Sequence, residues 1–421
     1  MLKKLKKFIK IFIDYRITEE ERVYTLKHTP LRVKRCYTQF YHRELEDLPI
    51  VQNKVVFDNY MGSGYGCNGK YVLQRLLESG IALDKKLDLV WTVKDVKRYQ
   101  NQFPPEIRLV EYGSAEAMRE YATAKVWVQN YQMVHYLNQG LKKKKGQYYI
   151  QMWHGSFGIK KIENNCNILQ QDQNWLTLAR WNSESTDYWI SNSDFETDVY
   201  RNAFWKVKNV LEYGHPRNDI FFAEDKEERC KKIRRNLGLG EEKLLLYVPT
   251  FRDDTMKVRQ PLDIPLLLGS LKERFGGEWK FLLRAHPRIK QFEDTSITEQ
   301  DEVMEVTDYP DIQELLLAAD AVITDYSSAV FDFMLSRKPA FLYIDDVDRY
   351  RQVRGLYYPV EETPFPIAGS NEELSEKILG FDEESYKKAV DVFLEGKGSK
   401  EEGQASQRVA ELIEDLIRKE S

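Results

Sequence analysis

The chain has 421 residues, which is long for one hydrophobic core and suits two domains. Hydrophobic residues make up 42% of it and charged residues 31%, so the composition provides buried cores and excludes bulk disorder. Its 63 Lys and Arg against 67 Asp and Glu give a formal net charge of −4, which excludes a global attraction to nucleic acid. We therefore expect no nucleic-acid partner, and any anion-binding site must be built locally.

The cysteines and histidines show neither a disulfide pattern nor a metal-binding pattern. The four cysteines, Cys36, Cys67, Cys166 and Cys230, are far apart and form no CxxC pair. The six histidines form no HExxH or HxH spacing. We therefore expect a reducing, cytoplasmic environment and no obligatory cofactor. Bound Mg²⁺ is an option that no visible cluster of ligands supports.

The first thirteen residues predict an amphipathic helix with a basic face. Its apolar residues Leu2, Leu5, Phe8, Ile9, Phe12 and Ile13 share one helical stripe, beside five lysines. This pattern suits an anionic membrane surface, at about 1 kcal/mol per lysine, although an ordinary helix packed on the body is the alternative. No apolar run reaches the roughly 18 to 20 residues that span a bilayer, and no signal peptide is recognisable. We expect a peripheral protein at the cytoplasmic face of the membrane.

A glycine-rich stretch follows the first predicted strand. It contains Gly62, Gly64, Gly66, Gly69 and Lys70. The spacing satisfies GxGxxG and nearly satisfies the P-loop, but Tyr71 stands where a P-loop has Ser or Thr. For a dinucleotide site, Asp95 is a late candidate for the acid at the end of the next strand. A plain tight turn and a loop whose N–H groups bind an acceptor or phosphate, with Lys70 beside it, are the other interpretations.

From about residue 50, short runs of β-branched and aromatic residues alternate with helical patterns. This predicts an α/β protein with two parallel sheets wrapped by helices. The predicted strands are 55–59, 87–93, 107–112, 125–129, 148–153, short ones near 189 and 210, and then 244–249, 279–284, 303–306, 321–324 and 340–344. The predicted helices include 70–79, 115–122, 311–319 and 329–336.

These elements predict four regions of chain. A membrane-surface helix and lead-in occupy 1–30, and a first Rossmann-like domain, expected to bind the acceptor, occupies 31–225. A second Rossmann-like domain, expected to bind the donor, occupies 226–375, and helices that pack back on the body occupy 376–421. The boundary between the domains lies in the charged stretch that contains Gly238 and Gly240.

Polar residues follow several predicted strands at their carboxyl ends, where parallel sheets place their ligands. In the first half, Trp153-His154-Gly155-Ser156 precedes Lys160-Lys161, a combination that suits an anion and a general base. A lone histidine is more often structural, but Gly, Ser and Lys beside it favour the functional interpretation. In the second half, the residues at three such ends are Pro249-Thr250-Phe251-Arg252, Arg284-Ala285-His286 and Asp325-Tyr326-Ser327-Ser328. Three polar ends directed the same way predict one crevice. Asp325 or Ser327 as a plain helix cap is the alternative for the third.

These motifs, taken in order, resemble the CDP-glycerol glycerophosphotransferase family, whose bacterial members build teichoic acids and capsular polymers. The resemblance is carried by Gln-Met-Trp-His154-Gly-Ser, Ile190-Ser-Asn-Ser-Asp-Phe-Glu, Glu212-Tyr-Gly-His-Pro-Arg217-Asn-Asp, Tyr247-Val-Pro-Thr-Phe-Arg252, Leu283-Arg-Ala-His286-Pro, Asp308-Tyr-Pro-Asp-Ile-Gln-Glu-Leu-Leu, Asp325-Tyr-Ser-Ser-Ala-Val-Phe-Asp332-Phe and Arg354-Gly-Leu-Tyr-Tyr. It covers roughly 125–359. Ser156-Phe157 stands where the family usually has Thr-Pro, and the region before Ala124 matches weakly.

The resemblance implies a GT-B architecture and transfer of glycerol phosphate from CDP-glycerol to an acceptor hydroxyl, with CMP leaving. It implies His154 as the general base, and His286 with Arg284 as the groups that neutralise the diphosphate. Arg217 would donate to a phosphate, and Thr307 and Asp308 would lie near the cytosine. The remaining residues expected at the donor are Trp153, Gly155, Ser156, Pro249, Thr250, Arg252, Asp325, Tyr326, Ser327, Ser328 and Asp332.

The acceptor is expected to be carried on a membrane lipid, in agreement with the basic helix. Two other functions are open on the sequence: transfer of ribitol phosphate from CDP-ribitol, and sugar transfer from a nucleotide sugar by the same fold. A binding protein that retains the fold without catalysis is the third, and the intact histidines speak against it.

Overall fold

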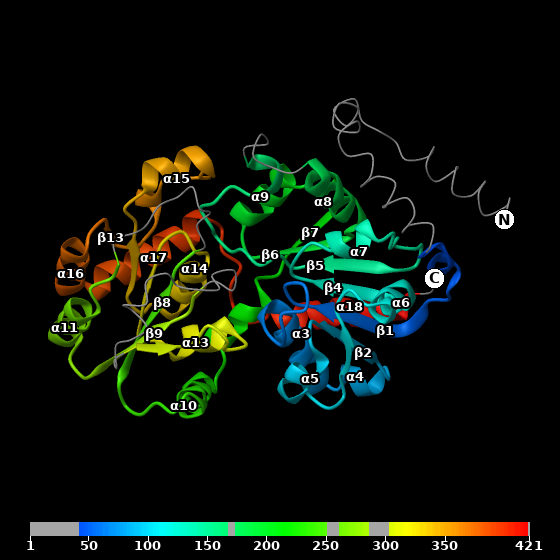
Figure 1. Ribbon diagram of the computed structural model, residues 1–421, viewed down its shortest axis with the longest axis horizontal. Helices are drawn as coiled ribbons and strands as arrows, with labels where there is room; N and C mark the ends of the chain where they lie inside the picture. Colours follow the sequence, from blue (N-terminus) through cyan, green and yellow to red (C-terminus); the bar gives the residue numbers. More distant parts are fainter. Residues whose placement is uncertain (1–41, 167–172, 251–260, 286–302, 420–421) are drawn as a thin grey trace.

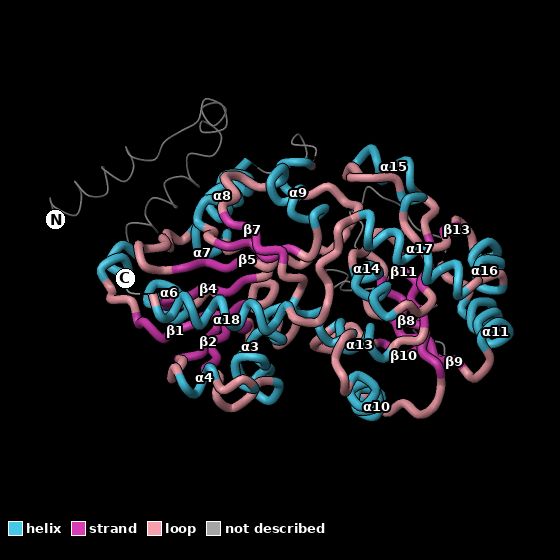
Figure 2. The backbone as a smooth tube through the Cα atoms, turned by 180° about the vertical axis from the view of Figure 1, so that it is seen from behind, coloured by secondary structure: helices cyan, strands magenta, loops and turns pink. Residues whose placement is uncertain are grey.

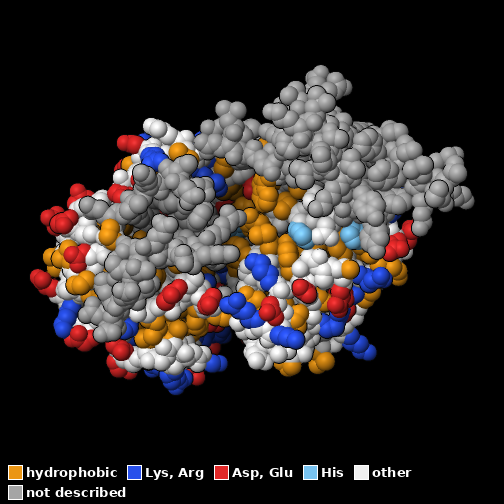
Figure 3. Space-filling model, viewed as in Figure 1, with side chains coloured by type: hydrophobic (Ala, Val, Ile, Leu, Met, Phe, Trp, Pro, Cys, Tyr) orange, Lys and Arg blue, Asp and Glu red, His pale blue; other side chains and the backbone are white. Residues whose placement is uncertain are grey.

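The computed structural model describes residues 42–166, 173–250, 261–285 and 303–419, and these form two lobes (Figure 1). The predicted helix over 1–13, Cys36, Arg252 and His286 lie outside the described residues. Each lobe is a parallel sheet covered by helices, which is the GT-B arrangement expected from the sequence. Acidic and basic side chains are interspersed over the coloured surface of both lobes (Figure 3).

The first sheet has the order β3-β2-β1-β4-β5-β6-β7. Its strands are β1 Val51–Asp58, β2 Asp88–Val93, β3 Arg108–Glu111, β4 Ala124–Gln129, β5 Tyr148–Gln151, β6 Tyr188–Ser191 and β7 Asn209–Glu212. Its helices are α3 Cys67–Glu78, α4 Ile81–Asp84, α5 Val96–Tyr99, α6 Ala115–Thr123, α7 Val134–Asn138, α8 Gln173–Ser185 and α9 Asp194–Ala203. All of its strand pairs are parallel, and the central strands are buried on both faces, as the apolar runs in the sequence predict.

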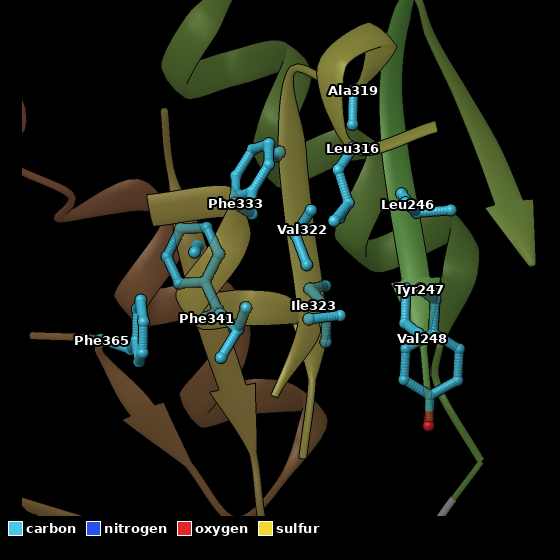
Figure 4. Packing of buried hydrophobic residues seen from close by; sticks show 14 of the residues in the cluster. Leu246, Tyr247, Val248, Leu316, Ala319, Val322, Ile323, Phe333, Phe341 and Phe365 are labelled. Atoms are coloured by element: carbon cyan, nitrogen blue, oxygen red, sulfur yellow. The ribbon is translucent and has the colours of Figure 1, made fainter. Parts of the chain in front are cut away.

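The second sheet has the order β10-β9-β8-β11-β12-β13. Its strands are β8 Lys243–Val248, β9 Trp279–Leu283, β10 Val303–Glu305, β11 Ala321–Thr324, β12 Ala340–Tyr343 and β13 Ile367–Ala368. The surrounding helices are α10 Lys226–Asn236, α11 Ile264–Phe275, α13 Ile312–Ala318, α14 Ala329–Phe333, α15 Val347–Val353, α16 Asn371–Leu379 and α17 Glu383–Gly396. Figure 4 shows side chains from the sheet, among them Leu246, Val322 and Phe341, packed against Leu316 and Phe333.

The strand order of the two sheets indicates where a ligand would bind. In each, the chain moves outward over three strands and then returns to the other side of the first, so a topological switch point lies at β1/β4 and at β8/β11. Ligands of doubly wound sheets bind at the carboxyl ends of strands at such points. The polar strand ends singled out in the sequence follow β5, β8, β9 and β11.

The chain ends by returning to the first lobe. After α17 in the second lobe, α18 Ala405–Arg418 packs against α3 and β4 of the first (Figure 2). Its apolar face fills that lobe's core through Val409, Ala410, Ile413 and Leu416. The connection between α17 and α18 therefore links the two lobes a second time, in addition to the chain between β7 and β8.

Candidate active site between the two lobes

His154 lies just beyond the carboxyl end of β5, in a backbone turn that fixes its position. Trp153 before it has a positive φ of 49°, and its N–H donates to Gln151 Oε1 over 2.9 Å. His154 Nδ1 lies 2.9 Å from the carbonyl oxygen of Asn130, which follows β4. A carbonyl only accepts, so Nδ1 carries the hydrogen and Nε2 is the nitrogen with a free lone pair. Within the described residues Nε2 has no hydrogen-bond partner.

Burial lowers the pKa of His154 from 6.5 to about 4. Arg217 and Lys160 lower it further, while the Asn130 bond acts in the opposite direction. The imidazole is therefore neutral at pH 7 and can accept a proton. An uncharged base beside positive groups is suited to a reaction in which an anionic substrate is bound.

Aromatic rings enclose this histidine. The rings of Trp153, Tyr60 and Tyr131 have their centroids 4.4, 5.2 and 5.4 Å from that of His154. Tyr60 has a positive φ of 45°, a backbone strain that is found mostly at functional sites. The imidazole is thus held on several sides and keeps partial contact with solvent.

The loop that continues from His154 is anchored in the second lobe. Phe157 and Ile159 are fully buried in that lobe's hydrophobic core. Tyr357 N–H donates to Ile159 O over 2.8 Å, and a Cβ added at Gly158 would lie 3.5 Å from Ser328 Cβ. The position of His154 relative to the second lobe is consequently fixed by packing, and Phe157, which departs from the family pattern, supplies part of it.

A buried ion pair joins the lobes beside this loop. Arg217, from the 3₁₀ helix Pro216–Phe221 that follows β7, donates through Nε to Asp332 Oδ2 over 2.9 Å and through Nη2 to Oδ1 over 3.2 Å. Nη2 also donates to Gly155 O over 2.5 Å. Burial opposes the charge of Arg217, but Asp332 raises the pKa of the guanidinium overall. Both residues were expected to contact the donor, and that contact stays a prediction; in the structure their side chains bond each other.

Asparagines extend this pair into a polar network that the sequence analysis did not assign. Asn218 Nδ2 donates to Asp332 Oδ1 over 3.0 Å and to Glu401 over 2.7 Å. Asn192 Nδ2 donates to Ser156 Oγ over 2.8 Å and to the same carboxylate over 3.0 Å. The two asparagines belong to motifs quoted above, so a signal for them existed, whereas Glu401 stands outside every motif.

In the second lobe, the ends of β8 and β11 are tied together. Asp325 is buried and accepts from Thr250 N over 3.0 Å and from Thr250 Oγ1 over 2.5 Å. Tyr326 is buried, stacks on Tyr350 and donates to Asp346 over 3.0 Å. These bonds fix the carboxyl ends of β8 and β11 relative to each other.

The two serines stand at the start of α14. Ser328 precedes the helix without a capping bond from its hydroxyl, and Ser327 Oγ accepts weakly from Ala329 N over 3.4 Å. Both are half-buried. Ser328 is the one whose Cβ lies next to Gly158 of the His154 loop, so this residue stands where the two lobes meet.

The residues after β9 and β10 have partners of their own. Arg284 Nη1 donates to Tyr309 O over 2.6 Å and to Val306 O over 3.3 Å, and burial lowers its pKa. Thr307 Oγ1 accepts from Ala285 N over 3.0 Å. Asp308 is 91% exposed and lies 3.4 Å from Arg98 of the first lobe.

The glycine-rich stretch is packed against the second lobe. Lys70 Nζ lies 2.8 Å from Asp311 Oδ2 and 2.5 Å from Glu314 Oε1, and Tyr71 OH donates to Asp311 over 2.9 Å. Lys70 is therefore neutralised within the protein. An anion-binding role for it stays a prediction that would require this pair to open.

The glycines of this stretch are required by close packing. A Cβ at Gly69 would come within 2.9 Å of the Trp91 ring, and one at Gly66 within 3.1 Å of Pro310 O. Gly64 has a φ of +102° and lies against Tyr99. Asp95, the late candidate for a ribose ligand, instead caps α5 by accepting from Arg98 N over 3.0 Å. These contacts give the stretch the role of a tight turn at the contact between the lobes.

In the described parts of the chain, no group of three or more His, Cys, Asp or Glu side chains is arranged to hold a metal ion. None of the helices described there has the length and apolar character needed to cross a bilayer.

Two facing Rossmann-like lobes, with a neutral histidine between them, define a protein of GT-B-like architecture. The model of the CDP-glycerol:poly(glycerophosphate) glycerophosphotransferase family matches residues 39–415, and the chain belongs to this family. This agrees with the resemblance found in the sequence.

Similar proteins support the assignment. A teichoic acid poly(glycerol phosphate) polymerase of Staphylococcus epidermidis is 30% identical over 94% of this chain and 56% of its own length. A teichoic acid glycerol-phosphate transferase of Staphylococcus aureus is 31% identical over 90% of this chain and 96% of its own. A structure of the wall teichoic acid polymerase TagF, in a histidine-to-asparagine variant soaked with CDPG, is 27% identical with a TM-score of 0.76, over 95% of this chain and 97% of that one. The chain thus spans little more than half of the first relative and nearly all of the other two.

We predict that Asp332→Ala lowers the free energy of unfolding by about 3–5 kcal/mol, because it leaves the Arg217 guanidinium buried without a carboxylate. Asp308→Ala is the matched control. It also breaks an ion pair between the lobes, but an exposed one, and should cost less than about 1 kcal/mol. Urea unfolding of both variants measures the difference, and equal losses would contradict the role of the buried pair.

Proposed function

We propose that this protein transfers glycerol phosphate from CDP-glycerol to a hydroxyl of a membrane-associated acceptor and releases CMP. The observation that carries the proposal is the tautomer of His154, whose Nδ1–H is held by Asn130 O while Nε2 is left unpaired within the described residues. Family membership supplies the donor class, and the site supplies a base of suitable protonation state.

In the proposed reaction, His154 Nε2 removes the proton from the acceptor hydroxyl. The acceptor oxygen forms a bond to the β-phosphorus of CDP-glycerol, and the bond from that phosphorus to the oxygen bridging to CMP breaks. CMP leaves with the electron pair of the broken bond, and glycerol phosphate becomes attached to the acceptor. The imidazolium returns its proton to solvent or to the leaving phosphate.

The donor is proposed to lie along the carboxyl ends of β8, β9 and β11. Ser327 and Ser328 provide hydroxyls at the start of α14. Thr250 lies at the end of the neighbouring strand β8, with its N–H and its hydroxyl bonded to Asp325. Arg284 adds a buried positive charge, and His286 is proposed from the sequence to assist it. Arg217 is proposed to act indirectly, because it donates to the carbonyl oxygen of Gly155, the residue next to the base.

The names of the teichoic acid relatives favour a glycerol-phosphate chain as the acceptor. The basic residues 1–13 favour an acceptor that is carried on a membrane lipid. A peripheral position at the cytoplasmic face of the membrane, with the basic residues 1–13 on anionic lipid, is part of this proposal. Teichoic acid synthesis is its cellular setting, and a capsular polymer is the alternative product.

We predict that the purified protein, given a glycerol-phosphate acceptor, releases CMP from CDP-glycerol and leaves CDP-ribitol and UDP-sugars largely intact. His154→Ala should reduce the rate at least about 100-fold, the usual contribution of a general base. His135→Ala, which alters a histidine of the same lobe that bonds Gln139, should leave the rate unchanged.

The panel also separates the other donors. Release of CMP from CDP-ribitol alone would replace glycerol by ribitol in the proposal, and release of UDP would replace phosphate transfer by sugar transfer. Wild-type turnover by His154→Ala would exclude this residue as the base.

Deletion of residues 1–13 tests the membrane interaction. We predict weaker binding to vesicles that contain anionic lipid, with unchanged turnover on a soluble acceptor, because five lysines are lost while the described site is untouched. Sedimentation with anionic and with neutral vesicles measures this. Equal binding of the full and shortened chains would contradict the prediction.

A further inference from the structure

The side chain of Glu401 lies behind the site, on the connection between α17 and α18. This connection is fixed to the first lobe at both ends. Lys400 N donates to Asn192 O over 2.8 Å, and Asp219 Oδ2 accepts from Ser406 N at the start of α18 over 2.7 Å. A carboxylate carried by this segment therefore has a defined place relative to the loops of the first lobe.

One oxygen of this carboxylate joins the two halves of the site. Glu401 Oε1 accepts from Asn218 Nδ2 over 2.7 Å and from Asn192 Nδ2 over 3.0 Å. Each amide uses its second N–H on a residue of the site: Asn218 donates to Asp332 and Asn192 donates to Ser156. An amide nitrogen has only two hydrogens, so both are committed.

We propose that Glu401 is a positioning residue for the transfer reaction. Through the two asparagines it fixes Ser156, next to the base, and the Asp332 carboxylate that holds Arg217. The claim rests on the proposed function and adds to it a residue of the C-terminal segment that does not touch the reacting atoms. Loss of the carboxylate frees one N–H of each asparagine and lets both amides rotate away from the site.

The surroundings of Glu401 also shift the pKa of its carboxyl group. A hollow of about 440 Å³ reaches it from outside, lined otherwise by Glu212, Tyr213, Ser399, Lys400, Glu402 and Arg408. His215, whose backbone N–H lies 3.3 Å from Oε2, faces it from the inner side together with Asp332. Burial raises the pKa of Glu401 to about 7, with Asp332 acting in the same direction and His215 and the asparagines against it.

The sign of the pH effect follows from this pKa. Between pH 4.5 and about 7 the folded protein keeps a proton on Glu401 that the unfolded chain releases. The contribution of this group to stability is therefore complete below pH 4.5 and is lost as the pH rises through 7. A glutamine at the same place has no such dependence and still offers an oxygen to both asparagines.

The test compares Glu401→Gln, Glu401→Ala and the exposed control Glu402→Gln, by CMP release from CDP-glycerol and by thermal unfolding from pH 5.5 to 8.5. We expect Glu401→Ala to lose at least about tenfold in kcat/KM, the loss that accompanies a hydrogen bond to a charged group. Glu401→Gln should recover most of that loss, and its unfolding temperature should fall less with rising pH than that of the wild type. Glu402→Gln should match the wild type in both.

Two results would overturn the proposal: normal kcat/KM in Glu401→Ala, or the same pH dependence of unfolding in Glu401→Gln and the wild type. The unfolding measurement needs no substrate. It compares Glu401→Gln with the wild type, so it tests the raised pKa of Glu401 even if the alanine variant folds poorly. An inactive wild type would instead count against the proposed function, so the two failures are distinguishable.

Discussion

The buried pair between Arg217 and Asp332 is the interaction on which the arrangement of the two lobes depends. A guanidinium without a carboxylate partner is costly in a buried position, so separation of the lobes at this point would require both charges to regain water. The pair is bidentate, and it fixes orientation as well as distance. The third contact of Arg217, to Gly155 O, extends that constraint to the residue next to His154.

The placement of the base is therefore a property of the contact between the lobes. His154 follows a strand of the first sheet, yet Phe157 and Ile159, a few residues on, are part of the second lobe's core. Asn130 fixes the tautomer from within the first lobe. From the second lobe, Ser328 after β11 lies next to Gly158 of the same loop. A movement of one lobe would change the distance between base and donor, and the ion pair, the packed loop and the Lys70–Asp311 contact all resist it.

Much of the fold could be predicted from the sequence, because parallel strands buried on both faces leave continuous apolar runs. The strand Ala321–Thr324 was predicted with its observed bounds, and most others were within one or two residues. The position of His154 at a strand end was predicted for the same reason. Contacts between the lobes could not be predicted. Lys70 and Asp311, for example, are 241 residues apart, and nothing in the local sequence indicates that they pair. The pairing of Arg217 with Asp332 could not be predicted either, because a free guanidinium and a buried one look alike in sequence.

Glu401 shows a second limit of sequence reasoning. It lies in a charged stretch, Lys400-Glu401-Glu402, of the kind that is usually a solvated surface. Only the return of the chain to the first lobe brings one of these side chains, half-buried, against the polar network. Asn192 and Asn218 stood within recognisable motifs, but their amides gained a role only when the carboxylate between them was located. The chemistry of single residues can be predicted from motifs, whereas the network that holds them depends on tertiary contacts.

The most direct test of the account is a crystal structure of the His154→Asn variant with CDP-glycerol bound. We expect the diphosphate to lie between the residue at position 154 and the serines at the start of α14, with Arg217 still paired to Asp332. A diphosphate bound instead at the glycine-rich stretch, with Lys70 released from Asp311 to contact it, would contradict the account and would make that stretch the donor site.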